Sequence, residues 1–251
     1  GTVNCLEFAR QRHVPKFIFL STSRTYSTKP LQEIRLRETP TRFEIATEQT
    51  IPGVSKNGMA ESFPTHLPSS LYGATKLASE LMVREYAHLY GLKTIVNRCS
   101  VLGGPGQFGK VDQGVLSLWI ANHYYGLPLK YTGYGGNGKQ VRDILHPSDL
   151  YQLLKRQLAK TEECQDRVFN IGGGTDNAVS LHELTQICER VVGKATSLTS
   201  DPDTHKVDIP CFISDTSAAK HAFQWAPTRT VESIVQETFE WFKENDINIR
   251  Q

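Results

Sequence analysis

The chain has 251 residues, 39% hydrophobic and 22% charged, a composition that excludes a protein disordered throughout. Its 28 basic and 26 acidic residues give a net charge of +2 with no block of like charges, so no nucleic-acid partner is expected. No run of about eighteen apolar residues could span a bilayer, so no membrane partner is expected either.

The cysteines are odd in number and widely spaced, at positions 5, 99, 164, 188 and 211. They form no CxxC pair, which argues against a zinc ribbon, a redox dithiol or a secreted disulfide framework. We therefore expect reduced thiols, no metal site and a cytoplasmic protein.

The first predicted elements are a helix, a strand and a loop. Val3, Leu6 and Ala9 indicate a helix that the chain enters without a cap, so we expect a truncated chain. The continuous apolar run over residues 16–21 is typical of a buried parallel strand. Residues 27–70 contain five prolines and little periodicity, which predicts a long loop.

After this loop the predicted elements alternate between helix and strand. Leu77, Leu81, Tyr86 and Leu89 fall on one side of a helix over residues 70–90, and we expect the Leu77 and Leu81 face to be core. The other elements are strands over 93–98, 141–146 and 167–172 and helices over 113–125, 149–159, 180–192 (opened by a capping box) and 231–245. This alternation predicts an α/β fold with a parallel sheet.

Tyr72 and Lys76 are four residues apart on the 70–90 helix, so their side chains share one face. An ammonium beside a phenol favours the phenolate, which can take a proton from a hydroxyl while hydride leaves the same carbon. The spacing alone is weak evidence, because it recurs at Tyr151 and Lys155, where we expect a solvated helix face. The first pair gains weight from the hydroxyl-rich segment 21–26 at a strand end, where ligands bind in parallel sheets.

Five features in this order resemble the extended short-chain dehydrogenase/reductases, within the NAD-dependent epimerase/dehydratase family. They are the hydroxyl-rich strand end, the YxxxK helix and the stretches 97–105 (NRCSVLGGP), 138–143 (GKQVRD) and 169–173 (FNIGG). Residues 111–115 and 138–146, with the long insertion between Thr22 and Tyr72, are most similar to the branch of the CDP-paratose 2-epimerases (CDP-tyvelose epimerases). The similarity covers nearly the whole chain.

The resemblance implies a Rossmann-like parallel sheet, with its N-terminal βαβ units missing, and a small C-terminal α/β substrate-binding lobe. Residues 1–110 would be the C-terminal part of the cofactor domain. Residues 111–251 would be mostly the lobe that binds the nucleotide sugar, with segments around 140–175 returning to the first domain. NAD as cofactor, a nucleoside-diphosphate sugar as substrate and a homodimer of the full-length protein are also implied.

The resemblance also assigns roles to individual residues. Thr22 would hydrogen-bond the substrate oxygen, Tyr72 would be the acid/base, and Lys76 would tune Tyr72 and hold the nicotinamide ribose. Arg142 matches an arginine that clamps the substrate diphosphate, and Asp208 a nucleotide-binding acid. The implied cofactor contacts are Ser21, Thr22, Tyr72, Lys76, Cys99 and Ser100. The other implied substrate contacts are Ser23, Arg24, Gln113, Gly114, Thr132 and His205, the last in place of an arginine that many members carry.

The glycine-rich phosphate loop of the family is missing from its expected place. Residues 104–109 and 133–138 both fit G-x-G-x-x-G. The first is not followed by a suitably placed acidic residue, and the second leads into an extended segment, so we interpret both as substrate-side loops.

These observations predict an NAD-dependent epimerase that acts on a nucleoside-diphosphate sugar through transient oxidation to a keto-sugar, with a CDP-sugar 2-epimerase as the specific hypothesis. Ser23 and Arg24 cannot serve as the acid pair of the 4,6-dehydratases, so a dehydratase is disfavoured. Two alternatives stay open: a nucleotide-sugar dehydrogenase or reductase of the same family, and an incomplete substrate-binding fragment without the phosphate loop.

Overall fold

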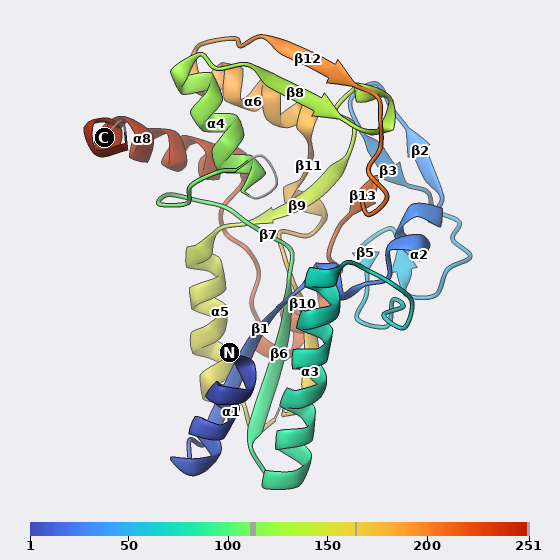
Figure 1. The fold of residues 1–251 in the computed structure, drawn as a ribbon, viewed down its shortest axis with the longest axis vertical. Coiled ribbons are helices and arrows are strands. Elements are labelled where there is room, and N and C mark those ends of the chain that lie inside the picture. Colours follow the sequence, from blue (N-terminus) through green and yellow to red (C-terminus); the bar gives the residue numbers. More distant parts are fainter. Residues whose placement is uncertain (111–113, 164, 250–251) are drawn as a thin grey trace.

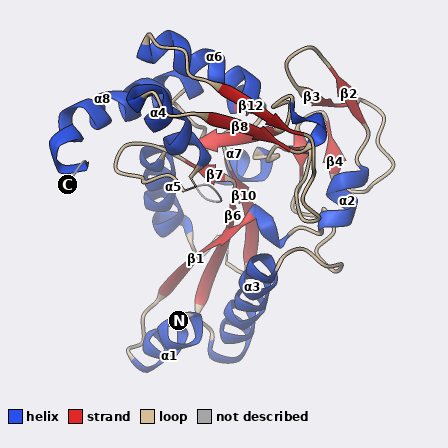
Figure 2. Cartoon of the chain, turned by 45° about the horizontal axis from the view of Figure 1, so that its top comes forward, coloured by secondary structure: helices blue, strands red, loops and turns tan. Residues whose placement is uncertain are grey.

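The computed structural model describes residues 1–110, 114–163 and 165–249. Its centre is a parallel sheet of three strands in the order β1–β6–β10 (Figures 1 and 2). These strands are β1 (Lys16–Thr22), β6 (Lys93–Cys99) and β10 (Arg167–Ile171). The predicted α/β fold with a parallel sheet is therefore confirmed.

Helices cover both faces of this sheet. They are α1 (Thr2–Gln11) and α3 (Leu71–Tyr90) on one face, and α5 (Pro147–Lys160) and α7 (Ser217–Phe223) on the other. Successive side chains of β1 point to opposite faces of the sheet and pack against the helices on each face. Phe17 and Phe19 belong to the same hydrophobic cluster as Val83 of α3. Ile18, between them, belongs to the cluster that contains Leu153 of α5.

The helix α3 turns a different side toward the sheet from the one predicted. Its buried residues are Gly73, Glu80, Val83 and Ala87. Leu81 is 54% exposed and Leu89 64% exposed, while Leu77 is only partly buried, so the prediction of a core face through Leu77 and Leu81 is wrong. The pattern of hydrophobic residues could not reveal the buried face of α3, because Glu80 lies at the centre of that face. Glu80 is a carboxylate that is buried through an ion pair with Arg98.

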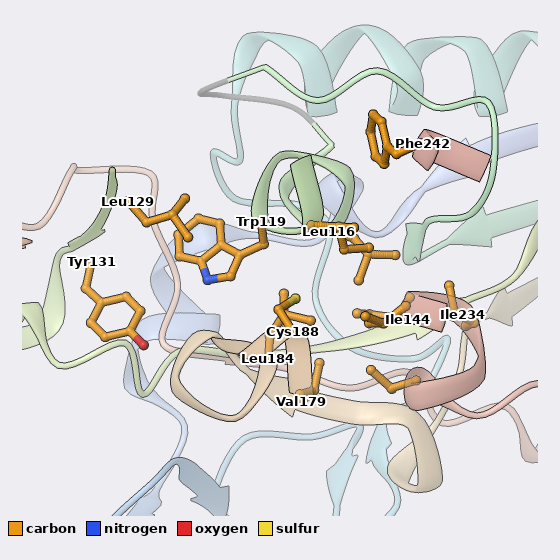
Figure 3. Close-up of a cluster of buried hydrophobic side chains, with 13 residues drawn as sticks. Leu116, Trp119, Leu129, Tyr131, Ile144, Val179, Leu184, Cys188, Ile234 and Phe242 are labelled. Carbon is orange, nitrogen blue, oxygen red and sulfur yellow. The ribbon is translucent and has the colours of Figure 1, made fainter. Parts of the chain in front are cut away.

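A second hydrophobic core lies among three helices and the strands beside them (Figure 3). The helices are α4 (Val115–Tyr125), α6 (Leu181–Val192) and α8 (Val231–Ile249). The strand β9 (Val141–Leu145) pairs with β7 (Val101–Leu102), β11 (Ala178–Ser180) and β13 (Cys211–Phe212), and β8 (Leu129–Thr132) pairs with β12 (Leu198–Asp201). The short 3-10 helices η2 (Tyr134–Gly136) and η3 (Thr175–Asn177) complete this part. The capping box predicted for α6 is present, with Ser180 and Glu183 as its two members.

The prediction of one long loop over residues 27–70 is wrong. This segment contains α2 (Thr28–Glu33) and two hairpins, β2 (Leu36–Glu38) with β3 (Phe43–Ile45), and β4 (Val54–Ser55) with β5 (Gly58–Met59). The hairpin strands are too short to show alternation, and contacts with distant segments hold them. The amide of Phe43 donates to the carbonyl of Lys139 (3.0 Å), and that of Met59 to the carbonyl of Ile213 (2.8 Å).

Within the part of the chain that the structure describes, no helix has the length and apolar character needed to cross a membrane.

The left-handed backbone conformation of Gly91 at the end of α3 can be tested by mutation. Gly91 has a φ of 69° in the left-handed region, and a Cβ at this position would meet no atom within 4 Å. Gly91→Ala should therefore lower the free energy of unfolding by about 1 kcal/mol through backbone strain alone, as measured by urea denaturation. Gly91→Asn should cost less, because asparagine tolerates this conformation. An alanine variant as stable as the original protein would contradict this account of the helix end.

Candidate active site

The carboxyl end of β1 runs directly into the 3-10 helix η1 (Ser23–Thr25). Thr22 ends the strand opposite Cys99 of β6, and its Oγ1 caps η1 by accepting a hydrogen bond from the amide of Arg24 (3.2 Å). The side chain of Arg24 is exposed, whereas Ser21 is buried. The hydroxyl of Ser21 donates its proton to the carboxylate of Glu80 at 2.5 Å, so it is directed toward α3.

The first two turns of α3 begin beside this strand end. Ser70 caps the helix by accepting a hydrogen bond from the amide of Gly73 (3.0 Å). Tyr72 lies in the first turn and is 56% exposed. One turn later, Nζ of Lys76 donates to the carbonyl of Leu20 in β1 at 2.6 Å. The structure thus brings the ammonium of Lys76 to β1 two residues before Thr22, with the exposed Tyr72 one turn earlier on the same helix.

Gly73 allows α3 to approach this closely. A Cβ on residue 73 would lie 2.0 Å from the carbonyl oxygen of Arg24 and 2.6 Å from Oγ of Ser69. Any side chain here would push the helix away from η1, since the carbonyl belongs to the backbone and cannot rotate aside. Glycine between Tyr72 and Ala74 is therefore required by packing.

Cys99 and Ser100 follow at the end of the neighbouring strand. The thiol of Cys99 is buried and lies 3.7 Å from the carbonyl of Asn97, and burial raises its pKa to about 12. The hydroxyl of Ser100 donates to the carboxylate of Asp143 at 2.5 Å. Burial raises the pKa of Asp143, although hydrogen bonds from Ser100 and the amide of Gly174 act in the opposite direction. The side chains of Cys99 and Ser100, two of the predicted cofactor contacts, therefore both have hydrogen-bond partners within the protein.

A second group of predicted residues surrounds β9. Nη2 of Arg142 donates to Oδ1 of Asp208 (3.2 Å) and to the carbonyl of Ile209 (2.7 Å), and Nη1 donates to the carbonyl of Val141 (2.8 Å). Burial lowers the pKa of Arg142, and the positive charge of Arg24 lowers it further.

The remaining predicted substrate contacts lie around this second group. Thr132 ends β8 with an exposed side chain, and its carbonyl accepts a hydrogen bond from Nε2 of Gln140 (2.6 Å). His205 is exposed in the loop that leads to Asp208. Gly114 forms the cap of α4 with a φ of 72°, and no hydrogen bond among the described residues connects it with the end of β1. Gln113 lies outside the described residues.

Sequence reasoning missed the ion pair that supports the candidate site, Glu80 with Arg98. One signal was available: Glu80 follows Lys76 by four residues and so continues the face of Tyr72 and Lys76. The burial of Arg98 near the carboxyl end of β6 had no such signal, because an isolated arginine in a strand gives no information about its partner.

A shallow hollow of about 310 Å³ lies beside the start of α3. Its lining residues are Thr28, Lys29, Gln32, Leu67, Pro68, Ser69, Lys206 and Val207, which include no predicted site residue. Among the described residues, no group of three or more histidine, cysteine, aspartate or glutamate side chains could hold a metal ion.

The described residues fit only one end of a dinucleotide. An exposed phenol and an ammonium at the carboxyl end of a parallel strand suit a nicotinamide and its ribose. A diphosphate needs a glycine-rich loop that joins a strand of the same sheet directly to a helix. Residues 104–109 follow β7, and residues 133–138 join β8 to β9, so neither stretch directly follows a strand of the β1–β6–β10 sheet.

Residues 1–172 match the profile of the NAD dependent epimerase/dehydratase family. The chain belongs to this family. Among its relatives, the CDP-paratose 2-epimerase of Salmonella typhi is 32% identical over 246 residues, which cover 96% of this chain and 69% of the relative. The dTDP-glucose 4,6-dehydratase of Salmonella typhimurium is 28% identical over 260 residues, with coverages of 98% and 65%.

A solved UDP-glucose 4-epimerase from Thermotoga maritima superposes with a TM-score of 0.74 at 24% identity, with 97% of this chain and 68% of that one covered. The family and the Rossmann-like fold that the sequence predicted are thus confirmed. This member of the NAD dependent epimerase/dehydratase family spans about two thirds of the length of the relatives it matches.

The close approach of α3 to η1 at Gly73 predicts whether Gly73→Ala raises or lowers the free energy of unfolding. Helix propensity alone predicts that Gly73→Ala stabilises the protein by about 1 kcal/mol. The contact with the carbonyl of Arg24 should reverse this and destabilise the protein by roughly 1–3 kcal/mol, as overpacking does. Urea denaturation measures the difference, with Ala74→Gly as the matched control, since it should cost about 1 kcal/mol by propensity alone. A more stable Gly73→Ala variant would show that α3 is not held against η1.

Proposed function

We propose that the intact protein is an NAD-dependent epimerase that inverts one carbon of a nucleoside-diphosphate sugar through a transient keto-sugar. The observation that supports this proposal is the packing of α3 against the end of β1: Lys76 bonds the carbonyl of Leu20, and Tyr72 lies one turn earlier on the same helix. Membership of the NAD dependent epimerase/dehydratase family supports both the class of reaction and the cofactor.

The residues at the end of β1 would divide the proton chemistry between them. NAD, when bound, accepts a hydride from the sugar carbon and returns it. Tyr72 would take the proton of the hydroxyl on that carbon and give it back after the sugar has turned over, and the positive charge of Lys76 would favour the phenolate. Oγ1 of Thr22 accepts a bond from the amide of Arg24, so its own proton is directed away from that amide and can bond the substrate oxygen.

The second group of residues would hold the nucleotide. The guanidinium of Arg142 on β9 and the exposed side chain of Arg24 in η1 would supply positive charge for the diphosphate. Asp208 fixes Arg142 and would contact the nucleotide, with Thr132 and His205 near it. We propose a CDP-sugar and inversion at C2 because the chain is 32% identical to a CDP-paratose 2-epimerase over 96% of its length.

A dehydratase is the alternative that the comparisons raise, because a dTDP-glucose 4,6-dehydratase is also similar to this chain. Elimination of water needs an acid near the reacting carbon. The two residues after Thr22 are Ser23 and Arg24, which form η1 and carry no carboxyl group. This difference favours the epimerase.

The proposal includes a homodimer in the cytoplasm. Exposed apolar side chains on α1 and α3 would suit a subunit interface; they include Val3, Phe8, Leu81, Met82 and Leu89. Free thiols at Cys5, Cys99, Cys188 and Cys211 suit a reducing compartment.

The test is to incubate the intact protein with NAD and CDP-paratose in deuterated water and to follow C2 by NMR. An epimer without deuterium at the inverted carbon is expected, because the same hydride returns. Tyr72→Phe should lower kcat at least about 10²-fold, the lower limit for removal of a general acid/base, while leaving nucleotide-sugar binding nearly unchanged.

Tyr151→Phe is the matched control, because Tyr151 and Lys155 repeat the same spacing on α5 with a 58% exposed tyrosine, as expected for a solvated face. It should keep full activity. Full activity of Tyr72→Phe would remove Tyr72 from the mechanism. Net reduction of NAD would favour a dehydrogenase, and turnover of dTDP-glucose with loss of water would favour the dehydratase.

A further inference from the structure

The ion pair between Glu80 and Arg98 lies beneath the candidate site and almost entirely out of solvent. Its side chains are 3% and 8% exposed. Nη2 of Arg98 donates to Oε2 of Glu80 at 2.7 Å, and Nε contacts both carboxylate oxygens at 3.1 and 3.2 Å. The same carboxylate accepts the hydroxyl proton of Ser21 at 2.5 Å. One buried group on α3 therefore binds β1 and β6 at once, next to the strand end that carries Thr22.

Three contacts fix α3 along the direction of β1. Gly73 packs against the carbonyl of Arg24, Lys76 bonds the carbonyl of Leu20, and Glu80 bonds Ser21. The ammonium of Lys76 is needed for chemistry under the proposed function, so only part of its donor capacity is left for the bond to Leu20. Gly73 prevents a clash, but its hydrogen bond goes to Ser70 of its own helix cap and not to β1 or η1. Glu80 is the contact that can keep α3 in register while Lys76 acts.

Arg98, the partner of Glu80, makes two further contacts. The guanidinium of Arg98 lies 4.9 Å from the ring centroid of Tyr26, and its Nη1 reaches the carbonyl of Glu61 at 3.4 Å. The hydroxyl of Tyr26 donates to Oδ1 of Asn170 in β10 at 2.7 Å, and the backbone amide of Asn170 donates to the carboxylate of Glu61 at 2.8 Å. These bonds connect the ion pair to all three strands of the sheet and to the 27–70 segment, so Arg98 provides a rigid anchor.

We propose that Glu80, held by Arg98, is a positioning residue for the reaction: it sets the register of α3 so that Tyr72 and Lys76 stand at the right distance from Thr22. The role rests on the proposed function, since Tyr72 and Thr22 act on the substrate and Glu80 acts only through them. Misplacement of a reacting group by about 1 Å can reduce a rate by roughly 10²-fold. A purely structural ion pair would affect stability without that effect on rate.

The test uses the double variant Glu80→Met/Arg98→Met in the intact protein with NAD. Removing one charge would leave the other buried and unpaired, which can unfold the protein, whereas replacing both by apolar side chains of similar volume is often neutral for stability. The matched control is Asn97→Leu/Gln157→Met. It removes a fully buried amide pair (2.7 and 2.8 Å) that ties β6 to α5 on the opposite face of the sheet.

Two measurements are made on each variant. For Glu80→Met/Arg98→Met, kcat for epimerisation per folded, NAD-loaded molecule should fall roughly 10²-fold with little change in KM. Amide hydrogen exchange over residues 74–80 should become faster. The Asn97→Leu/Gln157→Met control should change neither kcat nor exchange over these residues.

Either of two results would overturn the positioning role: exchange over residues 74–80 that stays as slow as in the unaltered protein, or faster exchange with an unchanged kcat. An unaltered protein without epimerase activity would instead reject the proposed function, and the exchange measurement would still decide whether Glu80 holds the register of α3.

Discussion

The candidate site depends on how closely α3 approaches the end of β1. The contact is made at backbone level, where the Cα of Gly73 faces the carbonyl of Arg24 without room for a methyl group. Backbone atoms of two elements define this distance, so it does not vary with side-chain rotamers. Tyr72 and Lys76 inherit their position from it. Two features of the surrounding structure keep that contact: a sheet that is buried on both faces, and a buried charge pair about two turns further along the helix.

The second group of residues is attached to this frame through β9. Its strand pairs with β7 on one side, and β7 follows β6 after a single residue, Ser100. The hydroxyl of Ser100 donates to Asp143 of β9, next to Arg142. Arg142 is therefore connected to the sheet within a few residues of the strand end that carries Cys99. The two parts of the candidate site share this short path of backbone pairing and one hydrogen bond. Tyr26, directly after η1, also belongs to the same hydrophobic cluster as Val141 and Ile209, which flank Arg142 and Asp208.

The sequence allowed the order of the main elements and the place of the candidate site to be predicted, because both depend on local signals. Continuous apolar strands, a capping box and the Tyr72 and Lys76 spacing can be recognised without a structure. The buried face of α3 could not be predicted, since Glu80 is polar and its burial depends on an arginine eighteen positions later, in another element. The hairpins of the 27–70 segment could not be predicted either. Their strands have only two or three residues, and hydrogen bonds to Lys139 and Ile213, far away in the sequence, hold them in place.

The orientation of individual site side chains also depends on partners that are distant in the sequence. The resemblance placed Ser21, Cys99 and Ser100 at the correct strand ends, but a motif does not specify which way each side chain turns. The hydroxyl of Ser21 turns to Glu80 and that of Ser100 to Asp143, while the thiol of Cys99 is buried. Their orientation is determined by partners that lie 59 and 43 positions away in the chain for the two serines.

The 27–70 segment has a practical consequence for work on this protein. Met59, at its second hairpin, is bonded on both sides, to the carbonyl of Ile213 and to the amide of Asp215, and its carbonyl also receives Nδ2 of Asn170. Two residues earlier the hairpin tip, residues 55–57, is exposed to solvent. Exposed tips next to firmly anchored backbone are the places where proteins accept inserted residues most readily. A fluorophore or affinity peptide introduced at this tip would therefore report on the protein without disturbing the packing of α3 on β1.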